Sequence, residues 1–208
     1  MILFDFDGTL ADTFLLGASL INDYAARFGY ENIDFEKNKD KSARELIKMA
    51  NVHFWEIPRL IRFFRRETIS HAQEIEAFSG IPELVTSLHN SGLALGVVST
   101  NTEQILRTFL DKYNLPEHFR YFTTEVSLFG KKRALRQARR KLRRMGHDGL
   151  IYIGDELRDI EACNAADIPI ISCAWGFNSY DVLSENNNFV AKDCGELEEM
   201  ITNYITAS

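Results

Sequence analysis

The chain has 208 residues, which is enough for one full hydrophobic core or for a core domain that carries an insertion. Hydrophobic residues make up 45% and charged residues 26%, as in globular proteins, and the net charge of −6 argues against a dedicated nucleic-acid binder. The longest apolar segments, such as "LIYI" and "IPIISCAW", are too short to span a bilayer, and the first residues do not resemble a signal peptide. The scattered Cys163, Cys173 and Cys194 indicate reduced thiols in the cytoplasm rather than disulfides or a zinc site.

The first part of the chain combines one apolar run with a long helical region. Residues 2–4 are all apolar, as expected of a strand that is buried on both faces. Between residues 12 and 28, apolar side chains recur every three or four positions, which predicts an amphipathic helix. Residues 31–41 are polar and are expected to form a loop, whereas "SARELIKMA" and residues 55–77 are expected to be helical. No strand signal appears between residues 14 and 78.

After Gly80, helical and strand patterns alternate. Helices are expected at "GIPELVTSLHNSG", "TEQILRTFLDKYN", residues 131–145 and "LRDIEACNAA", and strands at "LALGVVS", "YFTTEV", "LIYIG" and "IPIISCAW". This alternation predicts an α/β fold with a doubly wound, Rossmann-like parallel sheet. The predicted core comprises residues 1–13 and 79–208, and residues 14–78 are predicted to form an inserted α-helical cap domain.

Polar side chains follow three of the predicted strands and stand at the start of one predicted helix. They are Asp5 and Asp7, then Ser99, Thr100 and Asn101, then Asp155, Glu156 and Asp159, with Lys131 and Lys132 at the helix start. Because ligands bind beyond the carboxyl ends of parallel strands, these residues are expected to meet at one edge of the sheet. Several carboxylates together favour Mg²⁺ over Zn²⁺. The pattern suggests phosphoryl transfer through an aspartyl phosphate, with a second carboxylic acid as proton donor and acceptor.

Four segments, "DFDGTLAD", "VVSTN", "GKK" and "GDELRD", resemble in order the four motifs of the haloacid dehalogenase superfamily. The similarity is closest to its phosphatases related to phosphoglycolate phosphatase and extends over the whole chain, including the cap. It implies an Mg²⁺-dependent phosphatase in which Asp5 is the nucleophile and Asp7 the general acid and base. It further implies phosphate contacts from Ser99, Thr100, Asn101 and Lys131, and metal ligands from Asp5, Asp7 (through its carbonyl), Asp155 and Asp159. The family spacing after the glycine favours Lys131 over Lys132.

Other functions share parts of this pattern. A sugar phosphomutase has every core motif and is the nearest alternative. A true dehalogenase needs neither Asp7 nor Mg²⁺, and a phosphonate hydrolase needs a Schiff-base lysine in the cap, for which neither Lys41 nor Lys48 is singled out. The missing transmembrane helices exclude a transport ATPase. The non-enzyme alternative is a binding protein that uses the basic helix 131–145.

The segment "KKRALRQARRKLRR" contains nine basic residues among fourteen. Apolar side chains within and just after it fall at helical spacing, at Leu135, Ala138, Leu142 and Met145. We therefore expect a helix that packs on the core and exposes a basic face to solvent. No aromatic residue interleaves with the basic ones, so nucleic acid is not the expected partner.

The expected partner is a small phosphorylated metabolite, with no membrane partner, and the protein is expected to be a monomer or a homodimer. Substrate specificity is expected to lie in the cap, where "DKSAREL" carries Lys41, Ser42 and Arg44. These side chains suit a carboxylate or a second phosphate group. The segment "AWGFNS" is expected to form a loop beside the site.

Overall fold

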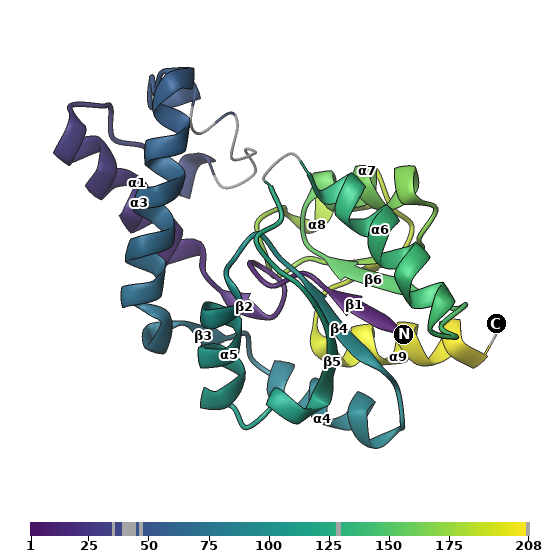
Figure 1. The fold of residues 1–208 in the computed structure, drawn as a ribbon. Coiled ribbons are helices and arrows are strands. Elements are labelled where there is room, and N and C mark those ends of the chain that lie inside the picture. The colour runs from purple at the N-terminus through teal and green to yellow at the C-terminus, as the bar shows by residue number, and fades with distance from the viewer. Residues whose placement is uncertain (35, 39–44, 46–47, 128–129, 207–208) are drawn as a thin grey trace.

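A six-stranded sheet forms the centre of the fold (Figure 1). The structure is a computed structural model that describes residues 1–34, 36–38, 45, 48–127 and 130–206. The strand order is β5-β4-β1-β6-β7-β8, and all neighbouring strands are parallel. The strands are β1 (Ile2–Phe4), β4 (Leu95–Val98), β5 (Phe119–Thr123), β6 (Ile151–Gly154), β7 (Ile170–Cys173) and β8 (Val190–Ala191). The predicted doubly wound α/β fold is confirmed.

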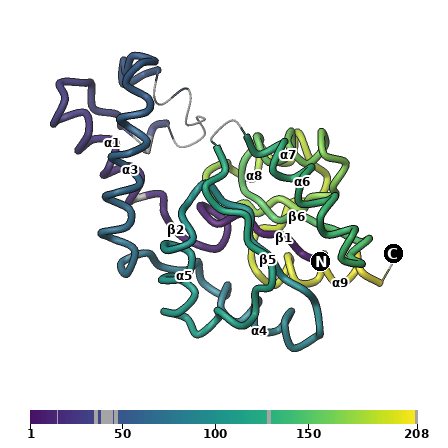
Figure 2. The backbone as a smooth tube through the Cα atoms, viewed as in Figure 1, coloured from purple at the N-terminus to yellow at the C-terminus, as the bar shows by residue number. Residues whose placement is uncertain are grey.

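Strand β1 comes first in the sequence but lies in the middle of the sheet, between β4 and β6 (Figure 2). Its residues pair with Leu95–Val97 on one side and Ile151–Ile153 on the other. From β1 the sheet is built outward through β4 and β5, and the chain then returns to the other side of β1 at β6. The carboxyl end of β1 is therefore the topological switch point, where ligands bind in folds of this class.

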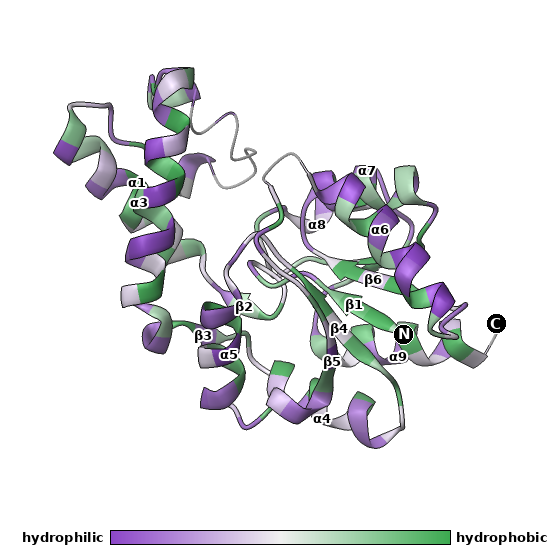
Figure 3. Ribbon diagram, viewed as in Figure 1, coloured by the Kyte–Doolittle hydropathy of each residue, from purple (hydrophilic) through white to green (hydrophobic). Residues whose placement is uncertain are grey.

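Helices cover both faces of the sheet. Helices α4 (Ile81–Asn90), α5 (Glu103–Lys112) and α9 (Cys194–Thr206) pack on the face to which Ile2 and Phe4 point. Helices α6 (Lys131–Arg144), α7 (Leu157–Ala166) and α8 (Tyr180–Ser184) pack on the face to which Leu3 and Tyr152 point. Figure 3 shows the apolar strands between helices that carry hydrophilic residues. Both sides of each central strand are thus removed from water, as the apolar runs predict.

The basic helix α6 is largely as predicted. Leu135, Ala138 and Leu142 are buried against the sheet, and most of the basic side chains of the helix are exposed to solvent. The prediction that Met145 belongs to this apolar face is wrong, because Met145 is 59% exposed. Helix α6 ends at Arg144, and Gly146 adopts a positive φ of 89°, so the chain turns away from the sheet at this point.

Between β1 and α4 the chain forms mainly helices. They are α1 (Phe14–Phe28), the 3₁₀ turns η1 (Glu36–Asn38), η2 (Phe54–Glu56) and η3 (Ala72–Glu74), and α3 (Ile57–Ser70). Helices α1 and α3 lie beside the sheet rather than on either of its faces (Figure 1), and they pack through aromatic rings such as those of Tyr24 and Phe63, whose centroids are 5.3 Å apart.

Two short strands join the start and the end of this helical region. Strand β2 (Ala11–Asp12) pairs antiparallel with β3 (Glu76–Ala77), so the outgoing and returning connections run side by side. The prediction of no strand between residues 14 and 78 is therefore wrong at β3. A strand of two residues is too short to produce a readable alternation of apolar and polar residues.

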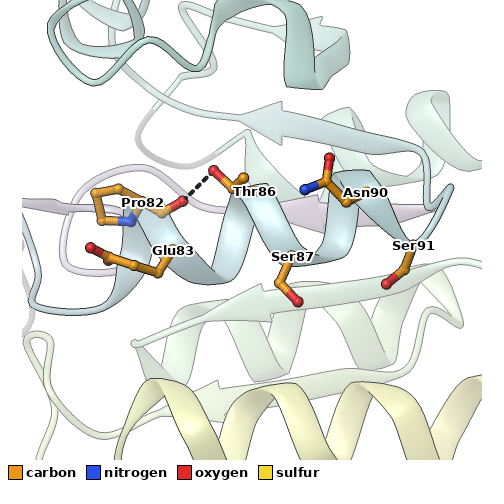
Figure 4. A pocket seen from close by; sticks show the side chains of 6 residues that line it. All are labelled: Pro82, Glu83, Thr86, Ser87, Asn90 and Ser91. Carbon is orange, nitrogen blue, oxygen red and sulfur yellow. Dashed lines mark hydrogen bonds between the residues drawn. The ribbon is translucent and has the colours of Figure 1, made fainter.

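A surface hollow of about 660 Å³ lies along α4, away from the switch point (Figure 1). It is lined by Pro82, Glu83, Thr86, Ser87, Asn90 and Ser91 (Figure 4). The Ser87 hydroxyl already donates to Glu198 at 2.5 Å, and none of the predicted site residues lines the hollow. Among the described helices, none combines the length and the apolar composition needed to cross a membrane.

Candidate active site

Asp5 follows β1 directly and is fixed by the sheet. Its backbone N–H donates to the carbonyl of Ile153 in β6 at 2.8 Å, and its Oδ1 accepts the N–H of Phe6 at 2.8 Å. The Phe6 ring is fully buried and packs edge-to-face on Phe109, with centroids 5.0 Å apart. Asp5 is only 3% exposed. The carboxylate is therefore held in the interior at the carboxyl end of the central strand.

Lys131, the first residue of α6, lies against Asp5. It is 5% exposed, and its ammonium donates to Oδ2 of Asp5 and to Oδ1 of Asp159. Its neighbour Lys132 is exposed. The structure thus brings Lys131, and not Lys132, to the carboxylates.

Asp155 is enclosed by two loops that approach it very closely. The Thr9 hydroxyl donates to its Oδ1 at 2.9 Å, and the N–H of Phe177 donates to its Oδ2 at 2.7 Å. A Cβ atom on Gly8, whose φ is +73°, would lie 2.1 Å from Oδ2, and one on Gly176 would lie 2.3 Å from the same atom. Only glycine fits at both places, so these residues let the loops close around the carboxylate.

The loop after β7 lies beside the site, as predicted for "AWGFNS". Trp175 donates its indole N–H to the carbonyl of Thr9 at 3.1 Å, and Asn178 accepts the N–H of Leu157 at 2.9 Å. The loop therefore connects the turn after β1 to the start of α7.

Asp159 lies in the first turn of α7 and is fully buried. Its Oδ2 accepts the backbone N–H groups of Asp155 and Glu156 at 3.3 and 3.2 Å, while its Oδ1 faces Lys131. The free N–H groups of a helix start stabilise a carboxylate in this position. Asp159 thus caps the start of α7 and also belongs to the carboxylate cluster.

The carboxylates of Asp5, Asp155 and Asp159 could hold a metal ion. Each is buried and offers an oxygen, and these oxygens lie within 4.8 Å of one another. Burial raises the pKa of Asp5 to about 7, although Lys131 opposes this shift. Burial, then Glu156 and Asp159, raise the pKa of Asp155 well above its ordinary value. The three buried carboxylates outnumber the one lysine that contacts them, and an all-oxygen donor set fits a hard divalent cation.

Asp7 is oriented by two neighbours. The Thr13 hydroxyl donates to its Oδ1 at 2.9 Å, and the Asn101 amide donates to both carboxylate oxygens at 2.9 and 2.8 Å. Burial is the largest influence on Asp7 and raises the pKa of its carboxyl group. The fully buried Ser99 in turn accepts the N–H of Asn101 at 3.0 Å, and Thr100 between them is half-buried. The loop after β4 therefore reaches the carboxylate of Asp7 through Asn101.

Several residues of the site were not among those predicted. Thr9 and Thr13 hold Asp155 and Asp7, and Arg158 donates through Nε and Nη2 to Glu156 at 2.8 and 2.5 Å. Burial raises the pKa of Asp5 and of Asp7, and Arg158 is among the positive charges that oppose this. All three lie inside the quoted motifs or one residue beyond them, which is the signal that could have found them. Lys41, Ser42 and Arg44 lie outside the described residues.

The buried ion pairs of Lys131 make a prediction about stability. Lys131→Met leaves Asp5 and Asp159 buried without their cation, and breaking such a pair costs about 3–5 kcal/mol. We expect the free energy of unfolding in urea, at neutral pH without divalent metal, to fall by this amount. The exposed Lys132→Met is the matched control and should change it by less than about 0.5 kcal/mol. Equal stability of the two variants would contradict the placement of Lys131.

Known phosphatases are similar to this chain over most of its length. The chain is 31% identical over 182 residues to the phosphoglycolate phosphatase of Synechococcus elongatus, which covers 85% of this chain and 84% of that protein. It is 25% identical to the N-acetylmuramic acid 6-phosphate phosphatase of Pseudomonas aeruginosa, over 85% of this chain and 82% of that protein.

Two solved structures show the same fold. A predicted phosphatase from Clostridium acetobutylicum superposes with a TM-score of 0.82 at 23% identity, over 97% of each chain. CbbY from Rhodobacter sphaeroides in complex with phosphate gives a TM-score of 0.73 at 21% identity, over 94% of this chain and 95% of that one. The model of the family described as haloacid dehalogenase-like hydrolase matches residues 2–173. The chain therefore belongs to the haloacid dehalogenase-like hydrolase family, as its four motifs predict.

Proposed function

We propose that this protein is a phosphatase that hydrolyses a small phosphomonoester through an aspartyl phosphate on Asp5, with Mg²⁺ as cofactor. The observation that carries the proposal is the placement of Asp5. Its buried carboxylate touches Lys131 and shares a cluster with Asp155 and Asp159. Relatives over most of the chain are phosphatases of phosphoglycolate and of N-acetylmuramic acid 6-phosphate, which supports a small phosphorylated substrate.

Asp5, Asp155 and Asp159, together with the backbone carbonyl of Asp7, would hold Mg²⁺. The ion would supply positive charge to phosphoryl oxygens and reduce the repulsion between a phosphate dianion and the carboxylates. The fit rests on three buried carboxylates that offer only oxygen and have one lysine among them.

In the first step, a carboxylate oxygen of Asp5 attacks phosphorus and the bond from phosphorus to the ester oxygen breaks. Asp7 gives its proton to the departing oxygen, so the product leaves as a neutral alcohol. A raised pKa suits this role, because the carboxyl group must carry a proton before it can donate one. Thr13 and Asn101 would hold Asp7 in the required orientation.

In the second step, water attacks the phosphorus of the aspartyl phosphate, and Asp7 takes the proton of that water. The bond from phosphorus to Asp5 breaks, which releases inorganic phosphate and restores the carboxylate. Lys131 would neutralise Asp5 when it leaves, and Ser99, Thr100 and Asn101 would bind the phosphoryl oxygens. Splitting the displacement in two lets a single acid residue serve as donor and then as acceptor.

Residues 14–78 are proposed to act as a cap over this site, attached through the paired strands β2 and β3. Substrate contacts from Lys41, Ser42 and Arg44 remain predictions. Cys163, Cys173 and Cys194 form no disulfide, which is consistent with a cytoplasmic enzyme.

A phosphate-release screen tests this function. Purified protein is incubated with a panel of phosphorylated metabolites, with Mg²⁺ and with excess chelator. We expect release from at least one small phosphomonoester with Mg²⁺ only. No release from any compound, or full release in chelator, would contradict the proposal.

Asp5→Asn tests the nucleophile. An amide neither attacks phosphorus nor binds Mg²⁺ well, so we expect no measurable phosphate release from a protein whose melting temperature shows that it still folds. Turnover within about tenfold of the wild type would assign the nucleophile elsewhere, because a variant without its attacking group should lose far more.

Asp155→Asn tests the metal site. Replacing one of three charged ligands should raise the Mg²⁺ concentration needed for half-maximal activity by at least about tenfold. Asp167→Asn is the matched control, because the Asp167 side chain is 84% exposed and should leave this concentration unchanged. The same Mg²⁺ requirement in both variants would remove Asp155 from the site.

Asp7→Asn tests the acid and base. General acid–base groups contribute about a hundred- to ten-thousandfold, and we expect steady-state turnover to fall by that factor. With labelled p-nitrophenyl phosphate, whose leaving group hardly needs a proton, the acid-quenched phosphoenzyme should accumulate because its breakdown slows more than its formation. Asp12 is a nearby exposed residue, and the Asp12→Asn variant should keep the turnover of the wild type. Normal turnover of Asp7→Asn would refute the role of Asp7.

A further inference from the structure

The ammonium of Lys131 faces an aromatic ring as well as two carboxylates. It lies 5.5 Å from the centroid of the Tyr152 ring. Tyr152 belongs to β6, is fully buried and points to the face of the sheet that α6 covers. A cation within about 6 Å of a ring face is attracted to it, and the attraction is stronger when water is excluded.

The sequence "YIG" of β6 makes this contact possible. Residues 152 and 154 lie on the same face of the strand, because side chains alternate along it. A Cβ atom on Gly154 would lie 2.9 Å from Cε1 of Tyr152 and 2.5 Å from Oδ2 of Asp159. The missing side chain at Gly154 therefore leaves room for the ring and for the carboxylate that also binds Lys131.

The hydroxyl group of Tyr152 does not explain why the residue is there. It is buried and has no hydrogen-bond partner among the described residues. A buried hydroxyl without a partner destabilises the folded state, so the hydroxyl contributes no stability at this position. The ring is thus the part of Tyr152 that contacts a group of the site.

We propose that Tyr152 is a positioning residue, whose ring holds the Lys131 ammonium against Asp5 and keeps water away from it. This inference rests on the proposed function, in which Lys131 neutralises Asp5 as the aspartyl phosphate breaks down. Without the ring, the ammonium can still donate to Asp5 and Asp159. Its third N–H group then has no fixed direction, and water can reach it. The ring should therefore affect turnover more than substrate binding.

Two substitutions separate the ring from the hydroxyl. With Mg²⁺ and p-nitrophenyl phosphate, Tyr152→Leu should lower kcat by about tenfold or more and change KM by less than about threefold. Tyr152→Phe keeps the ring and should retain at least about half of the wild-type kcat, with an equal or higher melting temperature.

Tyr121 provides a matched control. It lies on β5 in the same hydrophobic cluster, is 7% exposed, and its ring centroid is 5.3 Å from the ammonium of Lys141, a residue of α6 outside the site. Tyr121→Leu should lower the melting temperature as Tyr152→Leu does, yet leave kcat unchanged. Equal losses of kcat in both leucine variants, or in Tyr152→Phe and Tyr152→Leu, would overturn the inference.

The outcome for the wild type separates this inference from the function it rests on. If the wild type releases no phosphate with Mg²⁺ from any phosphomonoester, the proposed function fails and the inference fails with it. If the wild type is active and Tyr152→Leu matches its kcat, the function stands and the inference alone is wrong.

Discussion

Three carboxylates and one ammonium group share a small buried volume at the end of the central strand. Asp5, Asp155 and Asp159 lie within metal-binding distance of one another, and Lys131 bonds to two of them. Like charges at such separations repel by several kcal/mol even at an intermediate dielectric constant. One lysine supplies one positive charge for three carboxylates. Burial is the largest cause that raises the pKa of both Asp5 and Asp155. The divalent cation proposed for the site would add two positive charges and bring the total charge of the cluster to zero.

The rest of the fold keeps these groups together. The parallel register of β1 and β6 places Asp5 and Asp155 at the same edge, and the start of α7 brings Asp159 back to both. Glycines at positions 8 and 176 let two loops close over Asp155 without a clash. The four groups come from three segments: the end of β1, the start of α6, and the connection from β6 into the first turn of α7. The site therefore exists only when these segments have packed together. The proposed phosphatase chemistry therefore depends on the strand order, which places β1 next to β6.

The sequence predicts the sheet and the carboxylate cluster for one reason: buried parallel strands produce apolar runs, and polar residues that follow them meet at one edge. It could not predict β2 and β3, which are two residues long, nor the exposure of Met145, which depends on the turn at Gly146. Helix α9 has a readable signal in Leu197 and Ile201, both buried, although it was not predicted. The contact between Tyr152 and Lys131 depends on side-chain packing between β6 and α6, which spacing alone does not encode.

The central claim is that Asp5 becomes phosphorylated during turnover, and chemical trapping tests it most directly. Protein mixed with Mg²⁺ and a phosphomonoester that it hydrolyses is treated with borohydride, which reduces an aspartyl phosphate to homoserine. Mass spectrometry of the N-terminal peptide then identifies the modified residue. We expect homoserine at position 5 only when substrate is present. An unmodified Asp5 under turnover, or homoserine at another aspartate, would contradict the account.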